Sequence, residues 1–165
     1  MKWQIRSARQ PDLVDLTEIY NHYVVNTAIT FDTEPFSQDE RVSWFRQFNK
    51  IPEHLLLVAT LENKVVGYAC STRIRPKAAY DRSVETTIYL NPDIGGQGYG
   101  KKLYAALLLE LKKTKIHRCY GIITLPNEAS VALHTSLGFK QVSFLSEVGY
   151  KFNTYWDTVW LEKKL

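Results

Sequence analysis

The sequence predicts an α+β domain in which a mostly antiparallel central sheet is flanked by helices. Apolar, β-rich runs alternate along the chain with segments of helical periodicity, and two of those runs are joined by a short polar turn, as in a hairpin. No repeat, low-complexity tract or linker interrupts the 165 residues. We therefore expect a single domain, residues 1–165, that buries roughly two-thirds of the surface its unfolded chain exposes.

The first part of the chain predicts a strand, a helix, a loop and a second helix. Trp3 and Ile5 alternate with polar neighbours, as in a short strand. Pro11 and Asp12 then open a helix whose apolar positions are Leu13, Leu16, Ile19, Tyr20, Tyr23 and Val24. After a polar loop over residues 26–35, Ser37 and Glu40 form a capping box ahead of the apolar residues of the next helix, Val42, Trp44, Phe45 and Phe48.

The remaining elements surround a glycine-rich turn. Residues 55–59 and 65–70 are strands on either side of the turn Glu62-Asn63-Lys64, and a loop over 73–82 leads to a strand over 84–90. A helix over 101–113 follows the glycine turn. The predicted order then continues with a strand over 118–125, a short helix over 130–137 capped by Gly138, and strands over 139–144 and 155–161.

The composition indicates a globular protein and gives no sign of a nucleic-acid or membrane partner. The net charge is only +4, and the basic residues form no long block. No window approaches the ~18 uninterrupted apolar residues that a spanning helix needs, and the start, from Met1 to Arg6, lacks the apolar region of a secretory signal. Cys70 and Cys119 lie far apart in apolar stretches, which favours buried free thiols and a cytoplasmic location.

The segment Gly95-Gly96-Gln97-Gly98-Tyr99-Gly100 has the composition of an anion-binding turn. Glycines between a strand and a helix let backbone N–H groups approach phosphate oxygens, and the helix N-terminus adds positive potential. The segment also partly matches the Walker pattern, but Lys102 occupies the position of the magnesium-binding Ser or Thr. A dinucleotide fingerprint would need glycine where Lys101 stands. Taken alone, the glycines are also compatible with a tight turn that binds nothing.

A wider set of residues favours a binding turn. The run from Tyr89 to Lys101, followed by Asn127, Ser130 and Leu133-His134-Thr135-Ser136-Leu137-Gly138-Phe139, resembles the cofactor half of the GNAT superfamily of N-acetyltransferases. Gly98 and Gly100 match the two small positions of the family's pyrophosphate loop. Gly95 departs from the family pattern, because it stands where Arg or Gln is usual. The backbone donors remain, each worth roughly 0.5–1.5 kcal/mol net, so the turn is still expected to bind.

The resemblance extends to the phosphinothricin and methionine sulfoximine acetyltransferase branch of this superfamily. It spans nearly the whole chain. It rests on Ile19-Tyr20-Asn21, Thr27, Phe31-Asp32-Thr33-Glu34-Pro35, Arg75-Pro76-Lys77-Ala78-Ala79-Tyr80, Val84-Glu85-Thr86-Thr87-Ile88-Tyr89, Leu125-Pro126-Asn127-Glu128-Ala129-Ser130, Gly149-Tyr150-Lys151 and Trp156-Asp157.

The resemblance implies an acyltransferase that takes an acetyl group from acetyl-CoA and places it on the α-amine of a small amino-acid-like acceptor. The amine would attack the thioester directly, and no metal would take part. The backbone of Ile88, Tyr89 and Leu90 would pair with the pantetheine arm, which requires that their strand splay from the next one. The resemblance implies further contacts with the cofactor from Gly95, Gly96, Gln97, Gly98, Tyr99, Gly100, Lys101, Asn127 and Ser130.

The chemistry of amine acetylation singles out a base and an acid. Glu85, at the start of the strand that leads to the glycine turn, is the candidate base that takes a proton from the substrate ammonium. His134, four residues before Gly138, is the candidate acid for the departing thiolate. Each has an ordinary explanation as well: a solvated carboxylate at a strand edge for Glu85, and a packed histidine on a short helix for His134.

The acceptor is expected to lie beside Glu85. Arg75 and Lys77 precede its strand and offer cations to a substrate carboxylate, although they also fit an ordinary basic loop. Phe31 is the aromatic residue best suited to wall the pocket. The acceptor is expected to contact Arg75, Lys77 and Phe31, and also Pro76, Glu85, Thr86 and Thr87.

Two other functions remain open at this point. Acceptor loops vary most within one fold, so the substrate could be another amine, such as a protein N-terminus. A non-catalytic CoA-sensing module is the second alternative, which the glycine at position 95 allows. The resemblance also implies a homodimer, and the aromatic strand with Trp156 and Trp160 is compatible with one.

Overall fold

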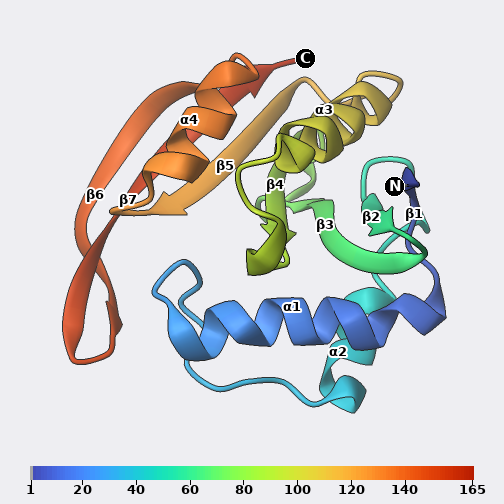
Figure 1. Cartoon of the computed structure of the whole chain (residues 1–165). Coiled ribbons are helices and arrows are strands. Elements are labelled where there is room, and N and C mark those ends of the chain that lie inside the picture. Colours follow the sequence, from blue (N-terminus) through green and yellow to red (C-terminus); the bar gives the residue numbers. More distant parts are fainter. Residues whose placement is uncertain (1) are drawn as a thin grey trace.

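The computed structural model describes residues 2–165. Met1, the first residue of the N-terminal segment discussed above, lies outside the described residues. These residues form one seven-stranded sheet with the strand order β1-β2-β3-β4-β5-β7-β6 (Figure 1). The strands are β1 (Trp3–Ser7), β2 (Leu56–Leu61), β3 (Lys64–Arg73), β4 (Ser83–Leu90), β5 (Arg118–Thr124), β6 (Lys140–Lys151) and β7 (Thr154–Lys164). Every neighbouring pair is antiparallel except β4 and β5. The α+β prediction is thus confirmed.

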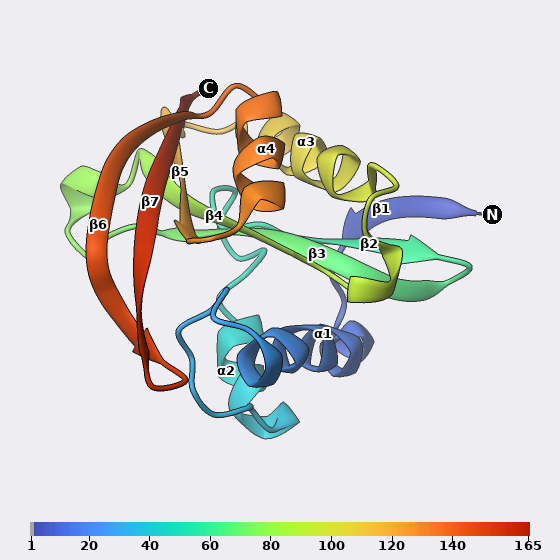
Figure 2. The same cartoon turned by 60° about the vertical axis from the view of Figure 1, so that its left-hand side comes forward.

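Helices cover both faces of the sheet, as Figure 2 shows most clearly. Helices α1 (Leu13–Asn26) and α2 (Gln38–Phe45) lie on one face, and α3 (Tyr99–Leu111) and α4 (Glu128–Ser136) lie on the other. Short 3-10 turns occupy Gln10–Asp12, Ala78–Tyr80 and Pro92–Ile94. Within residues 2–165, none of the helices combines the length and the apolar character that crossing a bilayer requires.

The sheet separates two apolar cores, because successive side chains of a strand point to opposite faces. On the α3 side the core is built on residues such as Leu103, Leu107 and Val84. On the α1 and α2 side it includes Leu16, Ile19, Phe48, Val58, Tyr68 and Cys70. Cys70 and Cys119 are buried free thiols, as predicted.

Several local predictions are confirmed by backbone geometry. The Ser37 hydroxyl accepts a hydrogen bond from Glu40 N, and the Glu40 carboxylate accepts one from Ser37 N, which makes the capping box at the start of α2. Glu62 and Asn63 adopt positive φ in the tight turn between β2 and β3. Gly138 follows α4 with a φ of +85°, the left-handed conformation expected of a C-terminal cap.

Among the boundaries that differ from the prediction are those of α2 and β6. Phe48 was expected on the second helix, but α2 ends at Phe45 and Phe48 is buried after its end. Strand β6 continues to Lys151 instead of ending at Phe144. Its register with β7 shifts between Leu145 and Gly149, so the alternation of apolar residues that marks a strand is broken there.

The strands β4 and β5 pair only at their beginnings. Ser83, Val84 and Glu85 are paired with residues 118–120 of β5, and no described strand is paired with the rest of β4 on that side. At its end, Leu90 O accepts a hydrogen bond from the Tyr23 hydroxyl. Beyond Glu85 the two strands diverge, as Figure 1 shows. The splay that the resemblance implied is therefore present, and it opens the middle of the sheet between its two halves.

Candidate active site

The glycine turn lies between the end of β4 and the beginning of α3, in the predicted order. Gly96 and Gly98 have φ values of +77° and +75°, and no atom lies within 4 Å of the position where a side chain would begin at either residue. Gly98 is the N-cap of α3, and residues 95–98 are exposed. The first amides of α3 therefore face open space at a helix N-terminus, the arrangement that binds phosphate oxygens.

The main chain of β4 presents polar groups to the gap beside it. Asn91 N donates a hydrogen bond to Val66 O across the end of the ladder between β3 and β4. Along a strand, successive residues point their N–H and C=O groups to alternate sides. The amide of Tyr89, two residues before Asn91, therefore also points toward β3. The amides of Ile88 and Leu90 point the opposite way, toward the gap. Of the three predicted backbone contacts, these two face the place where an extended ligand arm would lie.

A narrow slot between β4 and β5 connects this main chain to α4. It is lined by residues of both strands and of α4 with its N-cap, among them Asn127, Ser130 and His134. The Asn127 side chain accepts a hydrogen bond from Ser130 N and so caps α4. The structure thus brings these three predicted residues together at the slot, and it also gives Asn127 the ordinary helix-start role.

His134 belongs to a buried chain of hydrogen bonds. Its Nδ1 lies 2.8 Å from Ser130 O, and a carbonyl can only accept, so Nδ1 carries a proton. In that tautomer Nε2 accepts from the Tyr104 hydroxyl at 3.0 Å, and Tyr104 lies 2.7 Å from the Thr86 hydroxyl. Burial lowers the pKa of His134, so the imidazole is neutral at neutral pH. The chain of polar groups links α4 to β4 across the slot.

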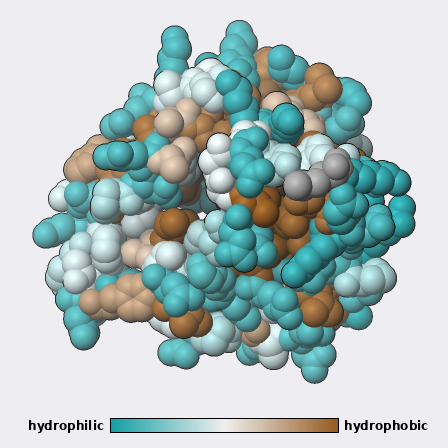
Figure 3. Space-filling model, in the orientation of Figure 1, coloured by the Kyte–Doolittle hydropathy of each residue, from teal (hydrophilic) through white to brown (hydrophobic). Residues whose placement is uncertain are grey.

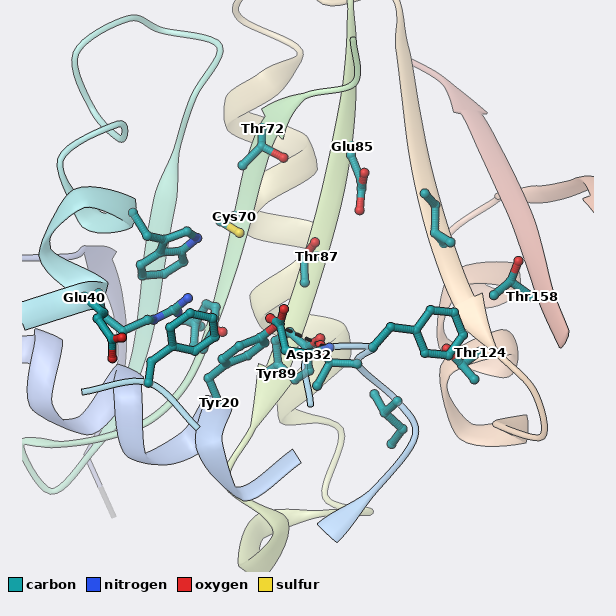
Figure 4. A pocket seen from close by; sticks show the side chains of 18 residues that line it. Tyr20, Asp32, Glu40, Cys70, Thr72, Glu85, Thr87, Tyr89, Thr124 and Thr158 are labelled. Atoms are coloured by element: carbon teal, nitrogen blue, oxygen red, sulfur yellow. Dashed lines mark hydrogen bonds between the residues drawn. The ribbon is translucent and has the colours of Figure 1, made fainter. Parts of the chain in front are cut away.

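The largest cavity near the gap lies on the α1 and α2 side of the sheet (Figure 4). Its volume is about 500 Å³, which is the size of an ordinary small-molecule site. Glu85, Thr87 and Tyr89 of β4 contribute one wall, together with Thr72 and Cys70 of β3. Figure 3 shows the surface hollowed near the middle of the view, in the orientation of Figure 1.

Glu85 extends from β4 into this cavity, as Figure 4 shows. Burial raises the pKa of its carboxyl group, and the nearby positive charge of Arg75 opposes the rise. Glu85 sits at the point where β4 separates from β5, so it lies between the cavity and the gap. A carboxylate in this position can take a proton from a bound ammonium group.

The other predicted acceptor contacts divide into two groups. Thr87 and Phe31 line the cavity with Glu85, whereas the Thr86 side chain points to the slot on the opposite face of the sheet. Arg75, Pro76 and Lys77 are exposed in the loop before β4, outside the lining of the cavity. The Arg75 guanidinium carbon lies 5.8 Å from the centre of the Trp160 ring.

The loop that carries Phe31 is held by contacts from distant parts of the chain. Asn21 of α1 binds both main-chain groups of Phe36, and the buried Lys151 ammonium donates to Thr30 O at 2.9 Å. Phe31 packs on Gly149, where a Cβ atom would lie 2.0 Å from its ring. Asn21, Gly149 and Lys151 belong to the sequence motifs quoted above, and these contacts give them a structural role in holding the loop.

The structure also brings to the cavity residues that the sequence analysis did not select. Tyr20 donates a hydrogen bond to Asp32, and both side chains line the cavity with Arg41 of α2. In the sequence Arg41 is one arginine of a polar helix, with nothing to distinguish it from exposed Arg46. Its burial follows only from the packing of α2 on the sheet.

The arrangement fits acetyl-CoA on observations of the chain itself. The open glycine turn at the start of α3 suits a pyrophosphate, the unpaired edge of β4 suits a pantetheine amide, and the gap leads to the cavity with Glu85. Among residues 2–165, no group of three or more His, Cys, Asp or Glu side chains is placed to hold a metal ion.

Comparison with known proteins identifies the class. The family model of the acetyltransferase (GNAT) domain matches residues 5–160, and the chain belongs to this family. It is accordingly an N-acetyltransferase that uses acetyl-CoA as the acetyl donor.

Relatives agree with this assignment over the whole chain. The phosphinothricin N-acetyltransferase of Streptomyces coelicolor is 46% identical over 98% of this chain and 96% of its own length. The L-methionine sulfoximine/L-methionine sulfone acetyltransferase of Salmonella typhimurium is 32% identical over 98% of this chain and 94% of its own. The crystal structure of a phosphinothricin acetyltransferase from Sinorhizobium meliloti in complex with AcCoA is 31% identical, with a TM-score of 0.95, and covers 100% of this chain and 89% of that one.

Proposed function

We propose that this enzyme acetylates the α-amine of small amino-acid-like acceptors of the phosphinothricin or methionine sulfoximine type. The observation that carries the proposal is the position of Glu85, in a charged and aromatic cavity at the mouth of the gap between β4 and β5. An acceptor amine in this cavity meets the thioester from the α1 side of the sheet while the cofactor turn lies at the end of β4. The names of the relatives support this class of acceptor.

Glu85 is the proposed base. An ammonium group must lose a proton before its nitrogen can attack the thioester carbonyl, and Glu85 takes that proton directly or through one water. Its raised pKa makes it a better acceptor of protons than an exposed carboxylate. The positive charge of Arg75 opposes this rise and so favours the ionised carboxylate, which a base requires.

His134 is the proposed source of the proton that the leaving thiolate takes up. In its protonated form His134 gives the Nε2 proton to the thiolate, and the ring returns to the neutral form in which Nε2 accepts from Tyr104. The lowered pKa of His134 makes the protonated ring a ready donor. Replacing His134 by Phe removes that donor, and we expect kcat to fall by about 100-fold, the ordinary range for an acid. An unchanged kcat in the His134→Phe enzyme removes His134 from the chemistry.

The acceptor's carboxylate is proposed to bind Arg75, with Lys77 and Pro76 of the same loop beside it. Arginine offers two parallel hydrogen bonds to a carboxylate, and Arg75 acts on Glu85, so the amine and the carboxylate of one amino acid can be held together. Phe31 and Thr87 complete the proposed acceptor contacts, whereas the Thr86 side chain faces the slot on the other side of the sheet and is not among them.

The experiment is the release of CoA thiol from acetyl-CoA across a panel of amines. The panel contains phosphinothricin, methionine sulfoximine, methionine sulfone, ordinary amino acids and a short peptide with a free N-terminus. Turnover of phosphinothricin, methionine sulfoximine or methionine sulfone supports the proposal. Turnover of the peptide alone shows that the substrate is a protein N-terminus, and no turnover with tight CoA binding shows a CoA-sensing module.

The enzyme is further proposed to form a homodimer through the hairpin of β6 and β7. This hairpin exposes a group of large apolar side chains, Val142, Phe144, Leu145, Val148, Tyr150, Phe152 and Tyr155. An exposed apolar surface of this kind marks a contact with another protein. Light scattering tests the proposal, since Phe144→Glu on the hairpin is expected to give a monomer and Gln141→Glu is not.

The cytoplasm is the proposed location. Cys70 and Cys119 are both buried as free thiols, and a reducing compartment keeps thiols in that state. Fractionation of cells with an antibody to the native protein tests this location.

A further inference from the structure

Arg41 is a buried arginine that has no anionic partner in the described part of the chain. It lies on α2 and is only 5% exposed. Its Nε and Nη2 atoms are buried without a hydrogen-bond partner, and no ion pair is found for it within residues 2–165. The guanidinium carbon lies 3.6 Å from the centre of the Trp44 ring and 4.6 Å from that of Tyr20.

Stacking on aromatic rings compensates this charge only in part. The rings attract the face of the guanidinium, whereas its N–H donors point outward in the guanidinium plane. A buried charge without hydrogen bonds is costly, so such a group is expected to meet an acceptor. Two of the acids that share the cavity with Arg41 are already engaged, because Asp32 accepts from Tyr20 and Glu40 closes the capping box with Ser37.

Arg41 lines the same cavity as Glu85, at its α2 side. The thiol of Cys70, on β3, lies near both charges. Burial raises the pKa of this thiol to about 12, Arg41 acts to lower it and Glu85 acts to raise it. Arg75 acts on Glu85 from the exposed side. The charges therefore run in the order Arg75, which lies outside the lining of the cavity, then Glu85 and Arg41, which both line it.

This order matches an amino acid whose side chain ends in an oxygen-bearing group. We propose that Arg41 binds the terminal phosphinate, sulfoximine or sulfone oxygen of the acceptor side chain, while Glu85 and Arg75 hold its amine and carboxylate. The proposal rests on the proposed function and names what sets the substrate class. The aromatic rings around Arg41 suit the methyl group that such acceptors carry on the same phosphorus or sulfur atom.

Paired acceptors that differ at the side-chain terminus test this role. We compare kcat/KM for phosphinothricin and for methionine, which lacks the terminal oxygen, in the wild type and in Arg41→Met and Arg41→Lys. A lost charged hydrogen bond is expected to lower the phosphinothricin-to-methionine ratio by roughly 10- to 100-fold in Arg41→Met. Arg41→Lys keeps the charge and is expected to lose less.

A purely structural role gives a different result. In that case both acceptors lose activity by the same factor, the ratio stays at the wild-type value and the proposal is overturned. Arg46→Met is the matched control, because Arg46 is exposed immediately after α2 and its loss is expected to leave the ratio unchanged. Thermal unfolding of each variant shows that the comparison is made on folded protein.

Calorimetric titration with phosphinothricin, in the absence of acetyl-CoA, separates this proposal from the proposed function. If the wild type acetylates nothing in the panel, the proposed function fails while the binding measurement still decides the role of Arg41. Binding by the wild type that Arg41→Met loses supports the role. No binding by the wild type, or equal binding by both proteins, overturns it.

Discussion

The two sides of the proposed active site are built in different ways. On the cofactor side, the turn at Gly96 and Gly98 and the open edge of β4 offer main-chain groups to the ligand. On the acceptor side, the cavity is defined by side chains with charge or aromatic rings, such as Glu85 and Arg41.

This difference predicts how the two sides respond to amino-acid substitution. A main-chain site depends on backbone conformation, so it tolerates most substitutions except those that the backbone forbids. A side-chain site changes its preference with each residue, which is how one fold can serve many acceptors. Substitutions on the two sides should therefore affect different Michaelis constants.

Replacing Glu85 by Gln is expected to have the largest effect, because it removes the base while keeping the shape of the cavity. We expect kcat/KM to fall by about 100-fold or more near neutral pH. The loss should shrink as pH rises, since more of the acceptor amine is then already neutral. A steady-state pH profile measures this, with Glu18→Gln on the exposed surface of α1 as control. A flat profile with wild-type activity contradicts the assignment of the base.

Replacing Arg75 by Ala should act on the acceptor alone. Loss of a charged hydrogen bond is expected to raise the acceptor KM by roughly 10- to 100-fold, with the KM for acetyl-CoA unchanged.

The same Arg75→Ala variant should also shift the pH profile. Arg75 opposes the raised pKa of Glu85, so its removal raises that pKa further. Because the base must be ionised, the acidic limb of kcat/KM then moves to higher pH. Arg82→Ala, at an exposed position later in the same loop, is the control. An unchanged acceptor KM would point to a different anchor.

Replacing Gly98 by Val should act on the cofactor alone. The residue has a φ of +75°, which a β-branched side chain adopts only with strain, although space is open around it. We expect the KM for acetyl-CoA to rise about tenfold, from a strain of about 1–3 kcal/mol at this position. Gly95→Ala is the matched control, since Gly95 has a φ of −59° and a side chain there makes only an ordinary contact. Equal effects of both changes would show that backbone conformation does not set binding.

Introducing arginine at Gly95 is expected to have the smallest effect. The added guanidinium can reach a phosphate, but the position is exposed, so affinity for acetyl-CoA should rise only about two- to fivefold. The dissociation constant for CoA at low and high salt measures it. A lack of change at either salt concentration means that the phosphate lies beyond the reach of residue 95.

The features that act through neighbouring backbone were predictable from the sequence. They are the capping box at Ser37, the turn at Glu62-Asn63 and the glycines before α3, and the structure has them where the sequence placed them. The end of β6 was not predictable in the same way, because the irregular register near Gly149 breaks the alternation on which strand prediction depends.

The sequence by itself determined the α+β sheet domain and the turn before α3, since periodicity and backbone preference are encoded within short segments. Only the tertiary structure decided that α2 buries Arg41 against Trp44 and that Gly149 makes room for Phe31. It also decided that Arg41 and Phe31 line one cavity with Glu85. The physical reason is that burial and charge proximity depend on segments far apart in the chain, which the packing of helices on the sheet brings together.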